Sequence, residues 1–227
     1  MSEPAATKTA DFSRCLAVLW SPTDAFTSLR MSPRAPLLLA VIGLTAALPA
    51  LAFLSRVDLP AFLLEEMQHA APGQAAPESA MRFVRETLAP LLRYALPLGA
   101  VLARSLSIVV VAAVGYAALR GLRPGLSLPL CIAAVSLGSA PLLLHDGLSV
   151  VVLLGRELAD VDVRNPVLSN PAAWLGLHIE RSALGAALHG LDVFRLWAAY
   201  LAARGLCVVA ERASTVPFAL TFGGQAV

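Results

Sequence analysis

The chain has 227 residues, of which 58% are hydrophobic and only 14% are charged. Soluble domains carry about 25% charged residues, well above this fraction. Together with a mean hydropathy of +0.74, the low charge indicates a membrane protein rather than a soluble one. The 17 basic and 15 acidic residues leave a net charge of +2, which gives no case for nucleic-acid binding.

Residues 1–34 are predicted to form a cytoplasmic amino-terminal tail and amphipathic helices. An apolar face recurs at helical spacing through Phe12, Cys15, Leu16, Leu19 and Trp20. The run Ser21-Pro22-Thr23-Asp24 then has the serine, proline and acidic residue of a second helix start. This helix pair either lies on the inner leaflet, with Trp20 at headgroup depth, or packs on the helical bundle.

Long apolar segments dominate the rest of the chain, residues 35–227, which we assign to one transmembrane bundle. About 20 apolar residues cross the ~30 Å hydrocarbon core as a helix. We predict spans at residues 35–55, 94–119, 126–155 and 185–209, followed by an apolar stub at 216–227 that is too short to cross. The fold class is therefore all-α, a polytopic helical bundle of about four to five spans.

Two details refine this expectation. Residues 56–93, between the first two spans, are predicted to hold two short amphipathic helices around a loop at 70–77. Pro141 is expected to bend the third span and to place His145 and Asp146 near the outer interface. Basic residues gather before the first span and in the turn from Arg120 to Arg123, so the amino-terminus is predicted to be cytoplasmic.

Arg104 is the main candidate for a functional site, because it is the single charge in the span at 94–119. A guanidinium at that depth costs about 2.5–3.5 kcal/mol unless it snorkels or finds a partner. Either Asp146 or Asp192 could neutralise it, although Asp192 and Arg195, three residues apart on one helix face, could also satisfy each other. Arg104 with its acidic partner forms either a polar site for a solute, ion or partner helix, or a structural contact that fixes helix register.

The residue types that catalysis or metal binding needs are not arranged for either purpose. Cys15, Cys131 and Cys207 form no C-x-x-C pair, so we expect neither a zinc site nor a disulfide framework. No two histidines have the helical spacing of zinc motifs, and Ser139 follows a glycine in a context typical of close helix packing. We therefore predict no catalytic residue, no metal, no cofactor and no enzymatic activity.

Several short motifs resemble a known family. They are Trp20-Ser21-Pro22 with Phe26 and Leu29, Ser139-Ala140-Pro141-Leu142-Leu143, Asn170-Pro171, the run Asp192-Val193-Phe194-Arg195-Leu196-Trp197, and Gly205-Leu206. Together they resemble the bacterial branch of the Yip family, multi-pass membrane proteins named for eukaryotic members that interact with Ypt/Rab proteins. The resemblance implies an all-helical bundle of about five spans in the plasma (inner) membrane, with the amino-terminus in the cytoplasm. It also implies a role in membrane organisation or as an accessory of export.

Two functions are compatible with these observations. The first is a non-enzymatic integral membrane protein that acts through helix contacts or protein partners, a second copy of itself included, within the lipid bilayer. The alternative is a small transporter or permease subunit with a polar midplane site around Arg104. The sequence has no evident inverted repeat or broken helix pair, the features of many transporters, and so favours the first.

Overall fold

The computed structural model describes residues 15–31, 34–70, 77–121, 123, 125–158, 161–163, 165–175, 188 and 190–211. These residues form helices joined by turns, with no strand among them, which confirms the all-α prediction. The tail at 1–14 and the apolar stub at 216–227 lie outside the described residues.

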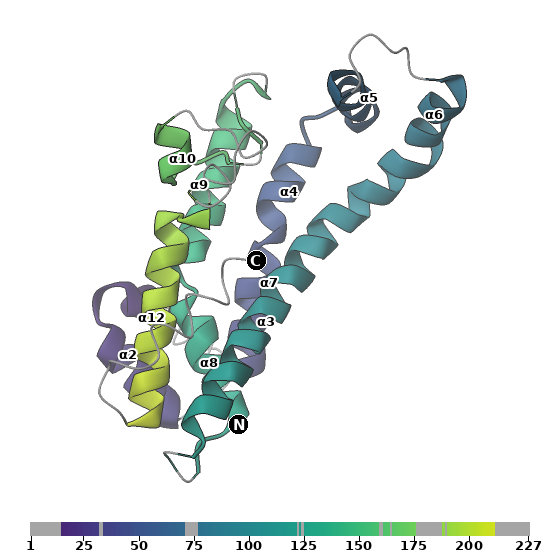
Figure 1. The fold of residues 1–227 in the computed structure, drawn as a ribbon. Coiled ribbons are helices and arrows are strands. Elements are labelled where there is room, and N and C mark those ends of the chain that lie inside the picture. The colour runs from purple at the N-terminus through teal and green to yellow at the C-terminus, as the bar shows by residue number, and fades with distance from the viewer. Residues whose placement is uncertain are drawn as a thin grey trace, which may run out of the picture.

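A short helix at residues 15–20 opens the described chain, and named helices follow it (Figure 1). In chain order they are α2 (Pro22–Met31), α3 (Ala35–Thr45), α4 (Ala47–Leu54), α5 (Leu59–Ala70), α6 (Glu78–Phe83), η1 (Val84–Leu88), α7 (Ala89–Leu119), α8 (Leu128–Gly138), α9 (Pro141–Gly155), α10 (Pro171–Trp174) and α12 (Val193–Ala210).

Helices α3 and α4 together make the first helix that could cross a membrane, Ala35–Leu54. Pro36 lies in its first turn, where a missing N–H costs nothing. The helix is interrupted only at Ala46, whose N–H donates to the carbonyl of Gly43, three residues back, at 3.2 Å. Such a tightened turn leaves the chain direction nearly unchanged, so α3 and α4 act as one element.

The second element is one continuous helix of 42 residues, Glu78–Leu119. The expected break between a short amphipathic helix and the span at 94–119 is absent, which corrects that prediction. Pro90 has no N–H for the carbonyl of Glu86, and the π turn η1 immediately before it lets the helix continue. Figure 1 shows this helix diverging from α4 towards its own α6 end, where α5 lies between the two.

Helices α8 and α9 meet at an angle of 42°, and Pro141 is the first residue of α9. The last described helix, α12, begins at Val193 rather than near residue 185, because Asp192 is not helical and caps the helix start. Three helices are therefore long and apolar enough to cross a membrane, or four if the bent pair is one span. The expected four to five spans reduce to this number in the described chain.

Glycines allow α12 to pack closely at the centre of the bundle. A Cβ added at Gly138 in α8 would lie 2.5 Å from the backbone of Ala202 in α12. Similarly, a Cβ at Gly205 would lie 2.6 Å from the ring of Phe26 in α2. Phe26 and Leu29 are fully buried, so the apolar face of α2 packs on the bundle. A position of this face at the membrane surface stays a prediction.

The buried apolar residues form two clusters, one towards each end of the bundle. The lower cluster in Figure 1 joins α2, α3, α8, α12 and the second half of α7, with Ile42, Ile108 and Ala140 among its members. The upper cluster joins α4, α9 and the start of α7, with Phe53, Ala89 and Leu153 among its members. Between the two clusters, polar residues of α3, α7 and α9 form a polar layer.

Candidate functional site

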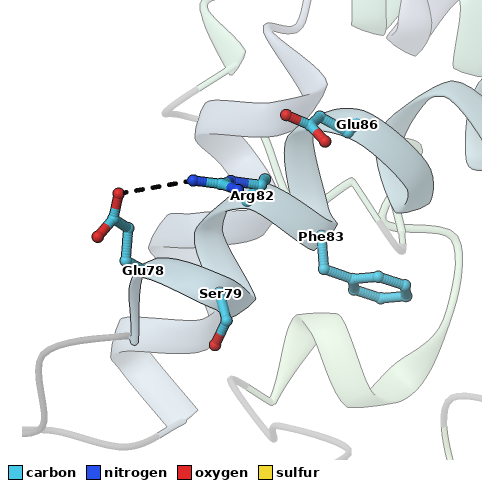
Figure 2. Close-up of a pocket in the computed structure, with 5 residues that line it drawn as sticks. All are labelled: Glu78, Ser79, Arg82, Phe83 and Glu86. Carbon is cyan, nitrogen blue, oxygen red and sulfur yellow. Dashed lines mark ion pairs between the residues drawn. The ribbon is translucent and has the colours of Figure 1, made fainter.

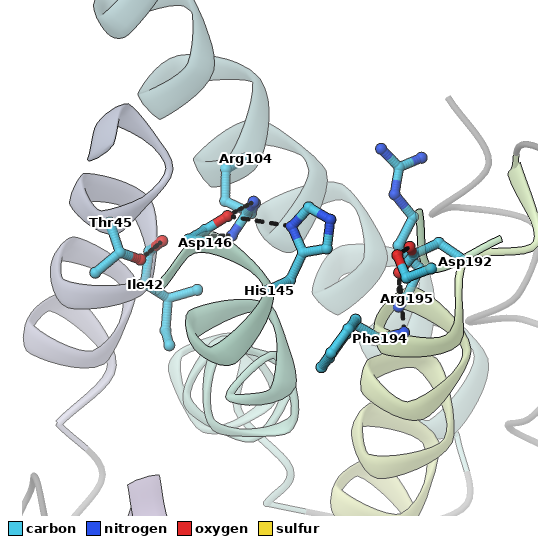
Figure 3. Close-up of polar contacts among 9 residues, drawn as sticks. Ile42, Thr45, Arg104, His145, Asp146, Asp192, Phe194 and Arg195 are labelled. Atoms are coloured by element: carbon cyan, nitrogen blue, oxygen red, sulfur yellow. Dashed lines mark hydrogen bonds and ion pairs between the residues drawn. The ribbon is translucent and has the colours of Figure 1, made fainter. Parts of the chain in front are cut away.

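The polar layer is built on an ion pair between Arg104 of α7 and Asp146 of α9 (Figure 3). Nη1 of Arg104 donates to Oδ2 of Asp146 at 3.1 Å, and Nη2 donates to Oδ1 at 3.2 Å. This two-pronged arrangement matches the planar fork of a guanidinium to the two oxygens of a carboxylate. Of the two partners that the sequence allows for Arg104, the structure brings Asp146 to it.

The Asp146 side chain is 3% exposed and that of Arg104 is 21% exposed, so both charges are largely withdrawn from solvent. Burying an isolated charge is costly, and pairing with good hydrogen-bond geometry offsets most of that cost. Because Asp146 contacts Arg104, the two side chains lie at the same level along the bundle. The α3–α4 junction borders the pair, where Thr45 donates its hydroxyl to the carbonyl of Ile42 at 3.0 Å (Figure 3).

His145 extends the polar layer from the ion pair towards α12. Its Nδ1 lies 3.7 Å from Oδ1 of Asp146. Its ring meets the ring of Phe194 edge to face, with centroids 5.6 Å apart. His145 therefore places an imidazole ring directly beside the ion pair.

Asp192 and Arg195 have separate roles from the ion pair. The Asp192 carboxylate caps α12, accepting from the backbone N–H of Phe194 at 2.9 Å and of Arg195 at 3.0 Å. It also accepts a hydrogen bond from the hydroxyl of Ser169. The Arg195 guanidinium points away from this carboxylate in Figure 3. The expected mutual contact of Asp192 and Arg195 is therefore made through the backbone of Arg195 and not through its charge.

Three buried serine hydroxyls lie on α8 and α9. Ser139, at the bend, donates to the carbonyl of Val135 at 2.9 Å, one helical turn back. The hydroxyls of Ser136 and Ser149 are buried and have no hydrogen-bond partner within the described chain. Ser149 is one turn from Asp146 on α9, so it adds a polar group next to the ion pair.

Two arginines that sequence reasoning did not single out cap helix carboxyl ends. Arg56 donates through Nη1 to the carbonyls of Leu153, Leu154 and Arg156 at the end of α9, at 2.8, 3.1 and 2.6 Å. Arg123 bonds the carbonyl of Val209 and pairs with Glu211 at 2.8 Å at the end of α12. Cations are favoured there by unpaired carbonyls and the helix dipole. Both lie just after a helix end, but sequence cannot say which helix each one reaches.

A shallow hollow at the start of the long helix is lined by Glu78, Ser79, Arg82, Phe83 and Glu86 (Figure 2). Its one ion pair in Figure 2 joins Arg82 and Glu78 at 3.9 Å, and both side chains are well exposed. Exposed pairs of this kind contribute little to stability or recognition. We therefore place the candidate site at the Arg104–Asp146 pair and not in this hollow.

Within the described residues, no group of three histidine, cysteine, aspartate or glutamate side chains is arranged to hold a metal ion. The fold and the polar layer define an all-helical protein with three helices, or four with the bent pair, that could cross a membrane. No protein-family model, curated protein or solved structure matches the chain.

Proposed function

We propose that this chain is a non-enzymatic multi-pass membrane protein of the plasma membrane that acts through lateral contacts with a partner helix. Its role would be that of an accessory of transport or membrane organisation. The observation that carries the proposal is a contrast between inside and outside. Charged groups in the interior bind one another or cap helices, whereas the longest helix leaves most of its surface uncovered.

The interior contacts are those of a structural framework. Arg104 is bound to Asp146, Asp192 caps α12, and Arg56 and Arg123 cap α9 and α12. Arginine and aspartate pairs placed between two apolar clusters fix helix register. With these charged groups bound inside the bundle, the outer surface is the region available to other molecules.

The outer surface of α7 is the most open part of the bundle. Only 22% of the most apolar stretch of the long helix is buried, against 56% for α12. Ala95, Gly99 and Ala103, spaced four residues apart, are exposed on it, and a Cβ added at Gly99 would contact nothing within 4 Å. We call these three residues the α7 outer face. Small residues at this spacing let a second helix approach closely within a membrane.

The resemblance to the Yip family forms part of this proposal and rests on the short motifs alone. In the structure four of these motifs contain a helix boundary: Pro22 begins α2, Pro141 begins α9, Asn170 caps α10, and Asp192 caps α12. Boundary residues of this kind serve any helical bundle. Family membership would therefore be supported by the identity of the partners that the chain binds, and not by its fold.

Site-specific photo-crosslinking in intact membranes tests the proposal. A crosslinking amino acid placed at Ala95, Gly99 or Ala103 should give a discrete protein adduct. The same group at Val151, which is exposed on α9, serves as the matched control and should give none. Gly99→Leu should abolish the adduct without changing resistance to unfolding, because the position is open. Lipid adducts alone at all four positions would contradict a partner on this face.

A polar transport site around Arg104 is the second candidate, and two observations favour it. The break between α8 and α9 is a broken helix of the kind that carries transporter sites. It lies less than two turns from Asp146, and the imidazole of His145 lies 3.7 Å from the carboxylate of Asp146. Asp146→Asn would then abolish proton flux into dye-loaded proteoliposomes while the protein stays folded. A structural pair instead predicts loss of stability in that variant.

A further inference from the structure

A groove of about 650 Å³ runs between α4 and α7, at the end of the molecule where the two helices separate (Figure 1). We call the end lined by Ser55, Arg93 and Tyr94 its mouth, and the apolar stretch lined by Leu51, Leu98 and Val101 its floor. The helices run in opposite directions, so the end of α4 and the start of α7 bring the three polar residues together.

The groove therefore changes from polar to apolar along its length. Eight residues separate Arg93 from Val101 on α7, which corresponds to about 12 Å of helix. Tyr94 is 75% exposed, and tyrosine is enriched where a membrane surface meets water. A molecule with a polar head and an apolar tail would match this order in one orientation only.

The charge at the mouth selects the head. Arg93 is exposed, and no carboxylate of the described residues forms an ion pair with it. Guanidinium groups bind phosphate oxygens through two parallel hydrogen bonds. The hydroxyl of Ser55 donates to the carbonyl of Ala52 at 2.7 Å, so it is anchored and offers its lone pairs to a polar head.

We propose that this groove binds one phospholipid with a net negative head group. Its phosphate accepts hydrogen bonds from the Arg93 guanidinium at the mouth, and one acyl chain lies along Leu51, Leu98 and Val101. A partner helix fits less well, because tight helix contacts in membranes favour small residues and this floor is leucine and valine. Such a helix would also bring an apolar surface against the Arg93 charge.

The lipid site is separate from the partner contact of the proposed function. Pro97 lines the groove and Gly99 belongs to the α7 outer face. Two residues correspond to about 200° around a helix, so the two faces look in nearly opposite directions. Failure of one proposal therefore leaves the other unaffected.

Native mass spectrometry of the purified full chain in detergent tests this site with two lipids, phosphatidylglycerol and phosphatidylcholine. The native chain should retain one phosphatidylglycerol and bind it about tenfold more tightly than phosphatidylcholine, because both lipids carry the phosphate but the choline cation is repelled by the Arg93 guanidinium. Arg93→Gln should remove this preference, and Arg93→Lys should keep part of it. Leu98→Trp, which fills the groove, should weaken the binding of both lipids.

Arg195→Gln is the matched control, because Arg195 is also exposed and lies at the start of another helix. It should leave phosphatidylglycerol binding unchanged. Equal retention of the two lipids by the native chain would overturn the proposal, as would an equal loss in Arg195→Gln and Arg93→Gln. A dimer peak that replaces the lipid adduct and disappears in Leu98→Trp would identify a second copy as the occupant and would also overturn it.

Discussion

Arg104 and Asp146 hold each other inside the bundle. The remaining charge would be left largely buried if either partner were neutralised. Removing one member of a buried ion pair costs about 3–5 kcal/mol, whereas replacing both by apolar residues is often neutral or stabilising. Single variants of the pair should therefore be less stable than the variant that replaces both residues.

We expect Arg104→Leu and Asp146→Leu each to lower the free energy of unfolding in mixed detergent micelles by about 3–5 kcal/mol. The double variant should recover most of the loss, because no unpaired charge remains. Arg82→Gln, which breaks only the exposed pair with Glu78, is the control and should change stability by less than about 1 kcal/mol. Simple additivity of the two single effects would show that Arg104 and Asp146 do not interact.

Asp192 is expected to behave as a helix cap and not as a partner of Arg104. Asp192→Ala removes the acceptor for two backbone N–H groups and should cost about 0.5–2 kcal/mol of unfolding free energy, while Asp192→Asn should retain most of it. The double-mutant cycle of Arg104 with Asp192 should give a coupling near zero. A coupling as large as that of Arg104 with Asp146 would contradict the assignment.

Helices α8 and α12 approach each other closely at Gly138. Gly138 ends α8 and lies against the backbone of Ala202, so any side chain there must separate the two helices. Backbone atoms cannot rotate out of the way as a flexible side chain can. Close approach at this one glycine sets the spacing of α8 and α12 and thereby the position of the bend that leads into α9.

Gly138→Ala should therefore lower the unfolding free energy by about 1–3 kcal/mol, through overpacking. Gly147→Ala on α9 is the matched control, since a Cβ at Gly147 would meet nothing within 4 Å. Alanine is the better helix former by about 1 kcal/mol, so the control should be neutral or slightly stabilising. Equal effects of the two substitutions on thermal unfolding would rule out close packing at Gly138.

The path of α8 and α9 decides how many times the chain crosses the membrane and on which side the later segments lie. Figure 1 shows α8 and the end of α7 at one end of the bundle, and the end of α9 at the other. A bent pair can either cross the membrane once or return to the same side. Arg120 and Arg156 flank the pair, and both are exposed.

We expect single cysteines at positions 120 and 156 to react with a membrane-impermeant thiol reagent from opposite sides of the membrane. Cys15, Cys131 and Cys207 are buried and would be replaced by alanine in the background chain. Labelling in intact cells should reach position 156, and labelling of position 120 should require permeabilisation, if the amino-terminus is cytoplasmic. Labelling of both positions from one side would make the bent pair a re-entrant loop.

The helical class and the location of the apolar segments could be predicted from the residues alone, because helix formation and burial in lipid depend on the local run of residues. The same residues identified Arg104 as a charge in need of a partner. That the partner is Asp146, and that Asp192 caps α12, became visible only once the helices were packed together. Arg104 and Asp146 lie 42 residues apart in the chain, and both Asp146 and Asp192 satisfy the same local rule, so only the packing of the helices selects between them.

The same reason accounts for the helix boundaries that differed. The continuous helix from Glu78 to Leu119 depends on a π turn before Pro90, and the start of α12 depends on contacts of Asp192 with Ser169. The capping arginines Arg56 and Arg123 likewise reach carbonyls on other helices. Hydrogen-bond partners across the bundle are set by the packing of whole helices, which a local pattern of residues does not contain.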